Sequence, residues 1–285
     1  MNTTCLLCRR QDNRVVFREM EVDMLRCNHC GHVFSSYETD QHYDEFWGDK
    51  EVKEPNEFWW NDAHEGMYGG FCRQYMTGRG GKLLDVGCGL GYFVKRAAAM
   101  PGWDAYGYEI SPHAVKFANT RLGLKNVRAG RVEESGFAPG FFDIITLWDV
   151  VEHIPDPQPM LRYLATLLKP EGLLFLHTPN IEFQLPKAKL KKMIRGMRPD
   201  LHYIEAKDHV NIFSPKTLTM LLERNGFSNL QFTHLKPVQS VSGSKSGLLK
   251  LAKNAWFYTA VALHRASLGS INVDNLFVAA RKSAA

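Results

Sequence analysis

Four of the six cysteines form two closely spaced pairs near the start of the chain. Cys5 and Cys8 make the first CxxC pair, Cys27 and Cys30 make the second, and eighteen residues separate the two pairs. Four thiolates carried on two tight turns can hold one zinc ion tetrahedrally, and four protein ligands leave no coordination position for a substrate. Disulfides are the alternative, but the first ten residues lack the apolar core of a signal peptide. The spacing therefore predicts a structural Zn²⁺ site.

A second set of residues has the spacing of a nucleotide-binding turn. In KLLDVGCGLGYF, Lys82 to Phe93, apolar residues end a predicted buried strand, and a helix-forming run from Val94 to Met100 follows. Between strand and helix, three glycines stand at every second position: Gly87, Gly89 and Gly91. Glycine lets the backbone turn tightly and approach a ligand without a Cβ in the way. The stretch therefore predicts a ligand cradle at the end of a strand.

Two carboxylates are expected beside this cradle. Asp85 ends the strand before the glycines, and Glu109 ends the next predicted strand, 24 residues later. The ends of adjacent parallel strands lie together, and a carboxylate there can accept both hydroxyl protons of a ribose. We therefore predict that Glu109 is the ribose ligand and that Asp85 orders the glycine turn. A solvated strand end is the alternative for Glu109.

The elements that must position these residues alternate between strand and helix. Strands are predicted at residues 82–86, 103–109, 126–129, 142–148, 172–178, 230–235 and 273–280, and helices at 94–100, 112–122, 157–168 and 215–225. This alternation is typical of an α/β fold with a doubly wound, mostly parallel sheet, here of seven strands. The last strand has no helix after it, which indicates an antiparallel hairpin at the sheet edge. A small zinc ribbon would precede this sheet.

Three longer runs extend the pattern: GRVEESGFAPGFFDIITLWDVVEHIPDP, LKPEGLLFLHTPN and HVNIFSPKTLTMLLERNGF. With the DxGxGxG that begins at Asp85, they resemble the class I S-adenosylmethionine (SAM) dependent methyltransferases, in the branch that includes quinone, sugar and secondary-metabolite methyltransferases. The resemblance covers Lys82 to Phe227 and implies SAM as the cofactor. The residues that it implies for cofactor binding are Asp85, Gly87, Cys88, Gly89, Gly91, Glu109, Ile110, Val132, Trp148 and Asp149. Arg131 stands where many relatives carry an acid for the adenine amine.

The chemistry of methyl transfer places two histidines among the candidate catalytic residues. Transfer from a sulfonium is an in-line displacement, so the enzyme mainly aligns the acceptor with the methyl carbon and excludes water. A hydroxyl acceptor must also lose its proton, and histidine titrates in the right range to take it. His153 follows the fourth strand and His209 lies on an insert expected to cover the pocket. A turn cap for His153 and a lid contact for His209 are the structural alternatives.

We therefore predict a SAM-dependent methyltransferase whose acceptor is a small molecule or a glycan-type hydroxyl. An RNA methyltransferase that grips phosphates with its ribbon and basic inserts is the first alternative. No NPPY-like tetrad follows the fourth strand, which argues against methylation of base amines in nucleic acid. A non-catalytic SAM-binding or scaffold protein is the second alternative, and the intact glycine turn with Glu109 argues against an inactive domain.

The domain organisation expected from these patterns has three parts. They are a zinc ribbon at 1–36, a helical cap or linker at 37–81, and a SAM-binding domain at 82–285 with a lid insert at 181–213 and a helical insert at 240–270. No apolar run reaches the length of a membrane span, which together with the missing signal peptide predicts a cytoplasmic protein.

The two inserts concentrate the positive charge of the chain. The net charge is +5, yet Lys187 to Arg198 and Arg224 to Val273 each hold six basic residues and no acid. A basic amphipathic helix is predicted in the first segment from the spacing of Leu190, Met193, Ile194 and Met197. In the second, residues 247–265 are helical in pattern and apolar on every side over 255–263, which favours burial in the core or in a homodimer. Two more specific hypotheses for the basic inserts are peripheral contact with the inner membrane surface and binding of a phosphate-bearing acceptor.

Overall fold

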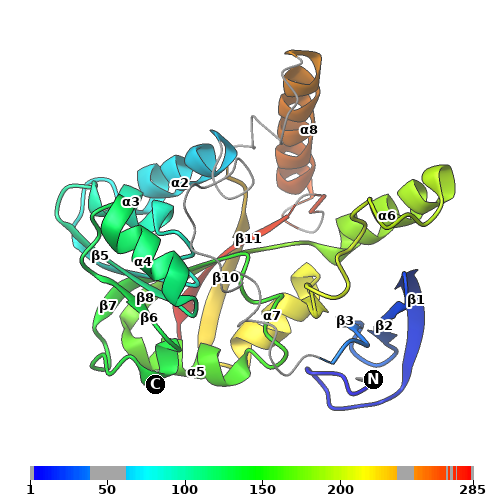
Figure 1. Ribbon diagram of the computed structural model, residues 1–285, viewed down its shortest axis with the longest axis horizontal. Helices are drawn as coiled ribbons and strands as arrows, with labels where there is room; N and C mark the ends of the chain where they lie inside the picture. Colours follow the sequence, from blue (N-terminus) through cyan, green and yellow to red (C-terminus); the bar gives the residue numbers. More distant parts are fainter. Residues whose placement is uncertain are drawn as a thin grey trace.

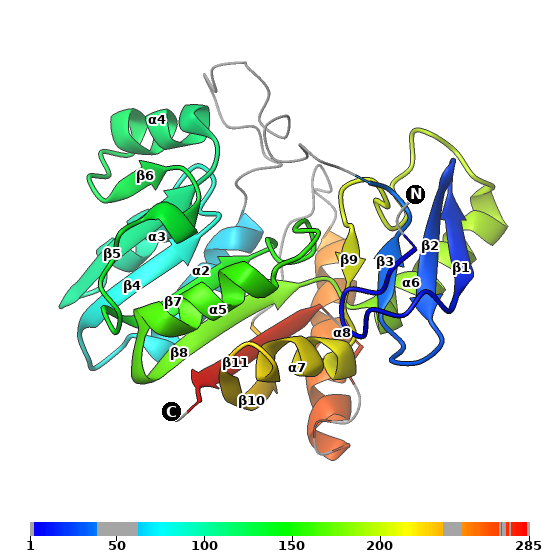
Figure 2. The ribbon, with the colours of Figure 1, turned by 90° about the horizontal axis from the view of Figure 1, so that it is seen from below.

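The computed structural model describes residues 3–38, 62–235, 247–267, 269, 272–273 and 275–283. The predictions for residues 39–61 of the cap and 240–246 of the helical insert lie outside the described residues. Within the described ranges the chain forms one sheet of seven strands and one of four, which lie side by side with helices around them (Figure 1, Figure 2).

The large sheet carries the glycine turn at the end of a central strand. Its order is β10-β11-β8-β7-β4-β5-β6. The strands are β4 (Gly81–Val86), β5 (Trp103–Glu109), β6 (Val127–Ala129), β7 (Phe142–Trp148), β8 (Leu168–Thr178), β10 (Phe227–Thr233) and β11 (Leu276–Lys282). Strands β8, β7, β4, β5 and β6 run parallel, while β11 is antiparallel to both β8 and β10. The predicted mostly parallel, seven-stranded sheet with an antiparallel hairpin at its edge is confirmed.

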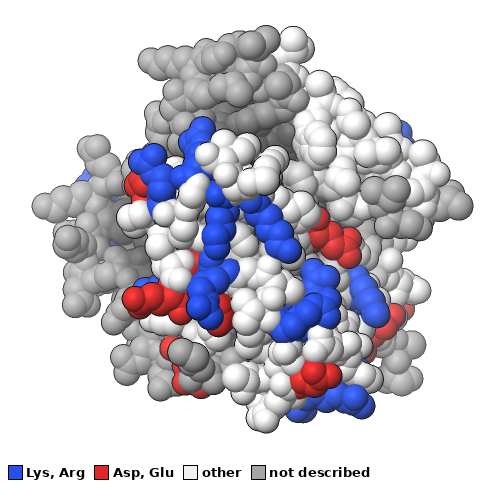
Figure 3. Space-filling model, turned by 90° about the vertical axis from the view of Figure 1, so that its right-hand side faces the viewer, with Lys and Arg blue, Asp and Glu red and all other residues white. Residues whose placement is uncertain are grey.

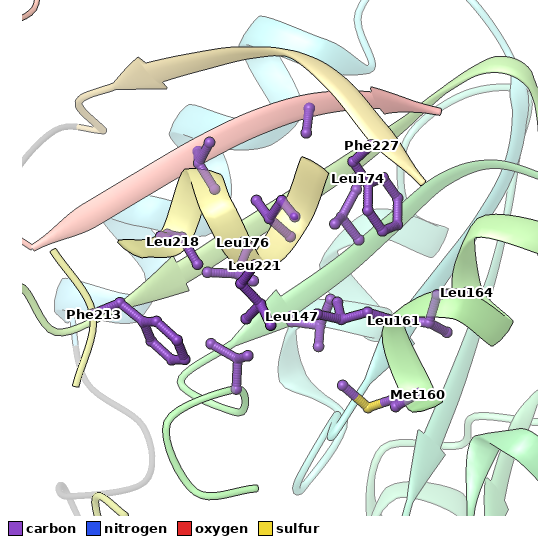
Figure 4. Packing of buried hydrophobic residues seen from close by; sticks show 14 of the residues in the cluster. Leu147, Met160, Leu161, Leu164, Leu174, Leu176, Phe213, Leu218, Leu221 and Phe227 are labelled. Carbon is purple, nitrogen blue, oxygen red and sulfur yellow. The ribbon is translucent and has the colours of Figure 1, made fainter. Parts of the chain in front are cut away.

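Helices cover both faces of this sheet because successive strand residues point to opposite faces. Leu174 and Leu176 of β8 share one core with α5 (Gln158–Leu167) and α7 (Pro215–Glu223), as Figure 4 shows. Leu173 and Phe175, from the same strand, belong to the core on the other face. That core also contains residues of α2 (Asp62–Tyr75), α3 (Tyr92–Ala98) and α4 (Pro112–Arg121). Burial on both faces explains why the central strands read as continuous apolar runs.

The small sheet joins the ribbon to the lid insert. Three of its strands come from the N-terminal region, β1 (Asn13–Glu19), β2 (Val22–Cys27) and β3 (Val33–Ser35). The fourth, β9 (Asn211–Ile212), lies in the lid insert and pairs antiparallel with β3. Figure 2 shows β9 beside β3. The ribbon therefore completes its sheet with a strand that lies almost 180 residues further along the chain.

The basic helix of the lid insert is longer than predicted and turns a different face inwards. Helix α6 (Ile181–Arg195) begins at Asn180, whose side chain accepts from Glu182 N, and it continues through Pro186. Its buried residues are Ile181, Leu185 and Ala188, which pack on the ribbon. Leu190, Met193 and Ile194 of the predicted apolar stripe are 53, 76 and 69% exposed, while Met197 lies beyond the helix and is partly buried against the ribbon. The ribbon packs against the first half of the helix, so it buries Ile181, Leu185 and Ala188 and leaves the later apolar residues exposed.

The apolar helix of the second insert is only partly covered. Helix α8 (Gly247–Ala266) projects away from the sheet (Figure 1). Phe257 and Ala260 are buried, but Trp256, Tyr258 and Leu263 of the predicted apolar stretch are exposed, as is Leu251. Of the two favoured outcomes, burial in the chain's own core therefore does not occur at these residues, and a homodimer stays a prediction. None of the helices in the described part of the chain combines the length and apolar character needed to cross a membrane.

Candidate active site

The glycine turn between β4 and α3 has a backbone that other residues would strain. Gly87 has a φ of +70°, and a Cβ built on it would lie 2.6 Å from Val150 Cγ2. Gly91, directly before α3, has a φ of +82°, and its Cβ would lie 2.9 Å from that of Ala118. Both the left-handed backbone and the close contacts exclude a side chain. The turn lies at the carboxyl end of β4, where open α/β sheets bind their ligands.

Glu109 ends β5 beside this turn and holds its backbone. Oε2 of Glu109 accepts a hydrogen bond from Gly89 N at 2.8 Å, and Oε1 accepts one from Ser111 N at 3.0 Å. The side chain is buried. Each carboxylate oxygen can accept a further hydrogen bond, so a ligand diol can be bound by the same group. The structure thus brings the acid of the second strand next to the glycines, as strand adjacency requires.

Asp85 lies at the same end of the sheet, buried next to β7. Thr146 Oγ1 donates to Asp85 Oδ1 at 2.7 Å. Burial raises the pKa of Asp85 to about 8, and the charge of Glu109 adds to the rise, although the hydrogen bond from Thr146 opposes it. A positively charged ligand group nearby would favour the ionised carboxylate again. Asp85 therefore suits a cationic ligand above the turn.

Three further residues implied for cofactor binding lie on or next to the strands β4, β5 and β6. Cys88 is buried within the glycine turn, and half-buried Ile110 follows Glu109 directly. Val132 is buried in the short 3₁₀ helix η1 (Val132–Glu134), beyond β6. All three therefore lie on the β4, β5 and β6 side of the sheet.

Trp148 and Asp149 mark the end of β7, next to β4. The Trp148 ring packs edge-on against Tyr68 of α2 at 5.0 Å and against Phe93 of α3 at 5.2 Å between ring centroids. Burial raises the pKa of Tyr68, and the charges of Asp85 and Asp149 add to this effect. Tyr68 therefore lies near both Asp85, at the end of β4, and Asp149, directly after β7.

Asp149 has a left-handed backbone, with a φ of 53°. Its Oδ1 lies 3.0 Å from Nδ1 of His177, which is on β8. The side chain of Asp149 is 46% exposed. Desolvation would raise its pKa, but His177, with His153 and His209 further away, holds the pKa below its usual value. A strained residue at the end of a central strand is typical of a functional site. Asp149 is therefore an ionised carboxylate at the junction of the glycine turn and the lid.

The two candidate catalytic histidines meet at this junction. The rings of His153 and His209 lie edge to face, with 4.9 Å between centroids. Nδ1 of His153 donates to the carbonyl of Asp208 at 3.0 Å, and Nδ1 of His209 donates to that of Ile204 at 3.1 Å. A neutral ring that donates through Nδ1 carries its lone pair on Nε2. Burial lowers the pKa of His209, although the charge of Asp149 opposes this, so this ring is neutral at neutral pH.

Glu152 joins the two histidines and is a residue that sequence reasoning missed. It is fully buried, and Thr178 Oγ1 donates to its Oε2 at 3.0 Å. Burial raises its pKa, and the charge of Asp149 raises it further. One ligand atom each from Glu152, His153 and His209 lie within 4.8 Å of one another. The signal was present, because a carboxylate inside an apolar run directly before a candidate histidine needs a buried partner.

The four thiols of the ribbon also come together. Cys5 Sγ lies 3.5 Å from Cys30 Sγ, and Cys8 Sγ lies 3.4 Å from Cys27 Sγ. All four sulfurs lie within 4.8 Å of one another. Each CxxC turn closes in the same way, with Arg9 N donating to the Cys5 carbonyl and Gly31 N donating to that of Cys27. Both donors have a positive φ, so the two halves of the site are built alike.

The strand order, the glycine turn and the acid that ends β5 define the class I SAM-dependent methyltransferases. The methyltransferase domain family model matches residues 71–232, more than half of the chain. The chain belongs to this methyltransferase domain family, and it is a SAM-dependent methyltransferase.

Individual relatives agree with this assignment. The chain is 30% identical over 183 residues to a ubiquinone biosynthesis O-methyltransferase of Bordetella avium, covering 59% of this chain and 73% of the relative. It is 32% identical over 144 residues to the Neisseria meningitidis enzyme of the same name, covering 48% and 55%. Among solved structures, the geranyl diphosphate C-methyltransferase of Streptomyces coelicolor matches with a TM-score of 0.53 at 16% identity, covering 78% of this chain and 79% of that one. At that identity the structural match concerns the fold alone.

Proposed function

We propose that this methyltransferase transfers the methyl group of SAM to a hydroxyl oxygen of a small, quinol-type aromatic acceptor. The observation that carries the proposal is the cluster of Asp149, Glu152, His153 and His209 at the end of β7, next to the glycine turn. The names of the relatives from Bordetella avium and Neisseria meningitidis support an oxygen acceptor and a quinone-related molecule. An acceptor bound over the end of β7 would have its hydroxyl between the sulfonium and the histidines.

The cofactor residues take their roles from this geometry. Glu109 would accept the ribose hydroxyls while it holds the glycine turn. Asp85 would face the cationic methionine end, and the backbone of Gly87 to Gly91 would line the remainder. Ile110 and Val132 would flank the adenine, and Trp148 with Tyr68 would close the aromatic wall beside the methyl group. Such a pocket excludes water and fixes the in-line approach, which accounts for most of the catalysis expected here.

The proton of the acceptor hydroxyl would move to Nε2 of His209. This nitrogen carries the lone pair, because Nδ1 donates to the carbonyl of Ile204. Glu205 Oε2 lies 3.6 Å from Nε2 and would stabilise the imidazolium that forms. The ionised Asp149 would add to that stabilisation, and His153 would hold the ring in place from its other side.

The donor set of the cluster also fits a divalent cation. Glu152, His153 and His209 would hold it, since ligating histidines commonly donate their other ring N–H to a backbone carbonyl, as both do here. When bound, such an ion would lower the pKa of the acceptor hydroxyl.

The test of the proposed function is methyl transfer from tritiated SAM to defined acceptors. A catechol-type or hydroquinone-type phenol should become labelled on oxygen, and the corresponding fully O-methylated compound, which has no free hydroxyl, should not. Label that appears only in glycan-type hydroxyls would change the acceptor class. Label that appears only in RNA would contradict the proposal.

We further propose that Cys5, Cys8, Cys27 and Cys30 hold one structural zinc ion. Purified, metal-replete protein should contain one zinc per chain by elemental analysis. Replacing Cys27 and Cys30 by serine should remove this zinc, because only two thiolates remain, while Cys72→Ser, at a buried thiol outside the ribbon, should not. Zinc-free protein in which the four ribbon thiols react freely with an alkylating agent would contradict the assignment.

The exposed faces of α6 and α8 point to an anionic lipid surface. The two helices meet where Phe183 stacks on Trp256, with 5.8 Å between ring centroids. Exposed apolar residues of both helices therefore lie near the lysines of α6, and Figure 3 shows basic side chains over the side of the molecule on which α6 lies. Each lysine near an anionic surface contributes about 1 kcal/mol, and shallow apolar insertion adds to that.

Sedimentation with vesicles tests this surface. At low salt the protein should bind vesicles rich in phosphatidylserine and ignore vesicles of phosphatidylcholine. Combining Met193→Ser, Ile194→Ser, Lys187→Gln and Lys189→Gln should abolish binding, whereas Arg121→Gln with Lys125→Gln, on the far side of the sheet, should not. A protein that ignores anionic vesicles and has twice the molar mass of one chain in solution would instead assign the face to a homodimer.

A further inference from the structure

The ribbon is joined to the lid by a continuous strand pairing rather than by a flexible contact. Val33 of β3 pairs with Ile212, and Phe34 pairs with Asn211. Next to this pairing, Ser35 N donates to the carbonyl of Val210 at 2.9 Å. The segment that carries His209 is therefore backbone-bonded to the ribbon one to three residues after this histidine. A ribbon that served only as an appendage would have no need of this pairing.

A buried side-chain bond reinforces the pairing. His32 follows the second CxxC pair, and its Nε2 donates to Asn211 Oδ1 at 2.9 Å. His32 is fully buried and Asn211 is 2% exposed. The His32 ring lies against Phe213, with 5.1 Å between ring centroids. Inside such apolar surroundings a hydrogen bond fixes the orientation of both partners, because the alternative is a buried polar group without a partner.

Asn211 passes this constraint on to the turn after β7. Its Nδ2 donates to the carbonyls of Ile154 at 2.8 Å and of Pro155 at 3.3 Å. Its backbone N–H donates to the carbonyl of Glu152 at 3.0 Å. These three hydrogen bonds fix the backbone of the segment that contains Glu152 and His153. Asn211 thus touches the ribbon with one side-chain atom and the β7 turn with the other.

The loop that orients His209 is tied to the ribbon independently. Glu19, at the end of β1, accepts hydrogen bonds from the backbone N–H groups of Tyr203, Ile204 and Ala206, each at 3.1 Å. Ile204 is the residue whose carbonyl accepts from His209 Nδ1. The ribbon therefore constrains both histidines of the cluster, one through Asn211 and the other through Glu19.

We propose that His32 and Asn211 are positioning residues, through which the ribbon holds the acceptor-side cluster in its catalytic arrangement. The inference rests on the proposed role of that cluster in methyl transfer. It assigns the ribbon a function in catalysis by this chain, rather than the capture of a separate partner. On the cofactor side, the bonds that hold the glycine turn come from β5: Gly89 N donates to Glu109, and Gly87 N and Cys88 N donate to the carbonyl of Tyr108.

The test uses four single substitutions in the full, zinc-loaded chain. His32→Leu and Asn211→Leu remove the bond, His32→Gln can restore a donor to Asn211 Oδ1, and His29→Leu is the control at an exposed histidine of the same ribbon. The turnover number with the phenolic acceptor should fall about 10–100-fold in the two leucine variants at the bond, the range for residues that orient catalytic ligands. SAM affinity by calorimetry should not change, His32→Gln should recover most of the turnover, and His29→Leu should behave as the unsubstituted protein.

Hydrogen exchange gives a readout that does not depend on turnover. In both bond-removing variants, backbone amides at 150–155 and 203–213 should exchange faster, while those at 83–95 should not. If this happens although no acceptor is methylated by the unsubstituted protein, the proposed function fails and the coupling stands. If His32→Leu also loses zinc, the result for Asn211→Leu is used instead, because Asn211 lies outside the ribbon and its substitution removes the same bond. Unchanged turnover and unchanged exchange in a folded Asn211→Leu protein would overturn the proposal.

Discussion

Replacing His209 by alanine should lower the turnover number with a phenolic acceptor by a factor on the order of 10²–10⁴, the usual contribution of a general base. The substitution removes the Nε2 lone pair, which the structure orients through the bond from Nδ1 to Ile204. SAM affinity should stay the same, because the glycine turn and the proposed ribose ligand Glu109 lie on the β4–β5 side. Rapid-quench turnover and calorimetry on the same protein measure the two quantities.

His202 provides a matched control for this substitution. It lies on the same lid and contacts the same Glu205, at 3.3 Å, but its side chain is 85% exposed. His202→Ala should therefore keep full turnover. If both alanine variants turn over equally, the proton of the acceptor leaves by another route.

Chelation separates the two chemical roles open to the cluster. If the histidines act as bases alone, brief treatment with EDTA should leave turnover unchanged. If Glu152, His153 and His209 hold a cation, turnover should fall and return on addition of Mg²⁺ or Mn²⁺, which a four-thiolate site does not select.

Replacing Glu109 by alanine should weaken SAM binding by about 1.5–3 kcal/mol, the scale of hydrogen bonds to a charged group. This corresponds to a loss of affinity of roughly 10- to more than 100-fold. The structure adds a second reason for the loss, since Glu109 also accepts from Gly89 N and Ser111 N and so holds the turn itself. Calorimetric titration with SAM measures the effect.

Asp104→Ala is the control for Glu109. Asp104 lies on the same strand but is exposed and pairs with Lys82 at the opposite end of the sheet. This substitution should leave SAM affinity unchanged. An affinity in Glu109→Ala equal to that of Asp104→Ala would place the ribose elsewhere.

Much of the cofactor side follows from local sequence. Glycines at every second position after an apolar strand indicate a tight turn, and Gly87 and Gly91 have φ values and contacts that no side chain tolerates. Glu109 could be placed because adjacent parallel strands must end side by side. The CxxC pairs could be recognised because each set of ligands lies within four consecutive residues. In each case, the residues that form the feature are close in sequence or end adjacent strands, so their relative positions follow from local geometry.

The acceptor side was decided by contacts between distant segments. His153 and His209 could be named separately, but only the fold brings their rings together with Glu152. In α6, two apolar stripes have helical spacing, and the sequence pattern alone favoured Leu190, Met193 and Ile194. The ribbon packs instead on Ile181, Leu185 and Ala188, so the first stripe stays exposed. The pairing of β3 with β9 involves two short strands without a periodic signal of their own. Hydrophobic periodicity reports that a face will be buried, but which segment buries it depends on packing across the whole chain.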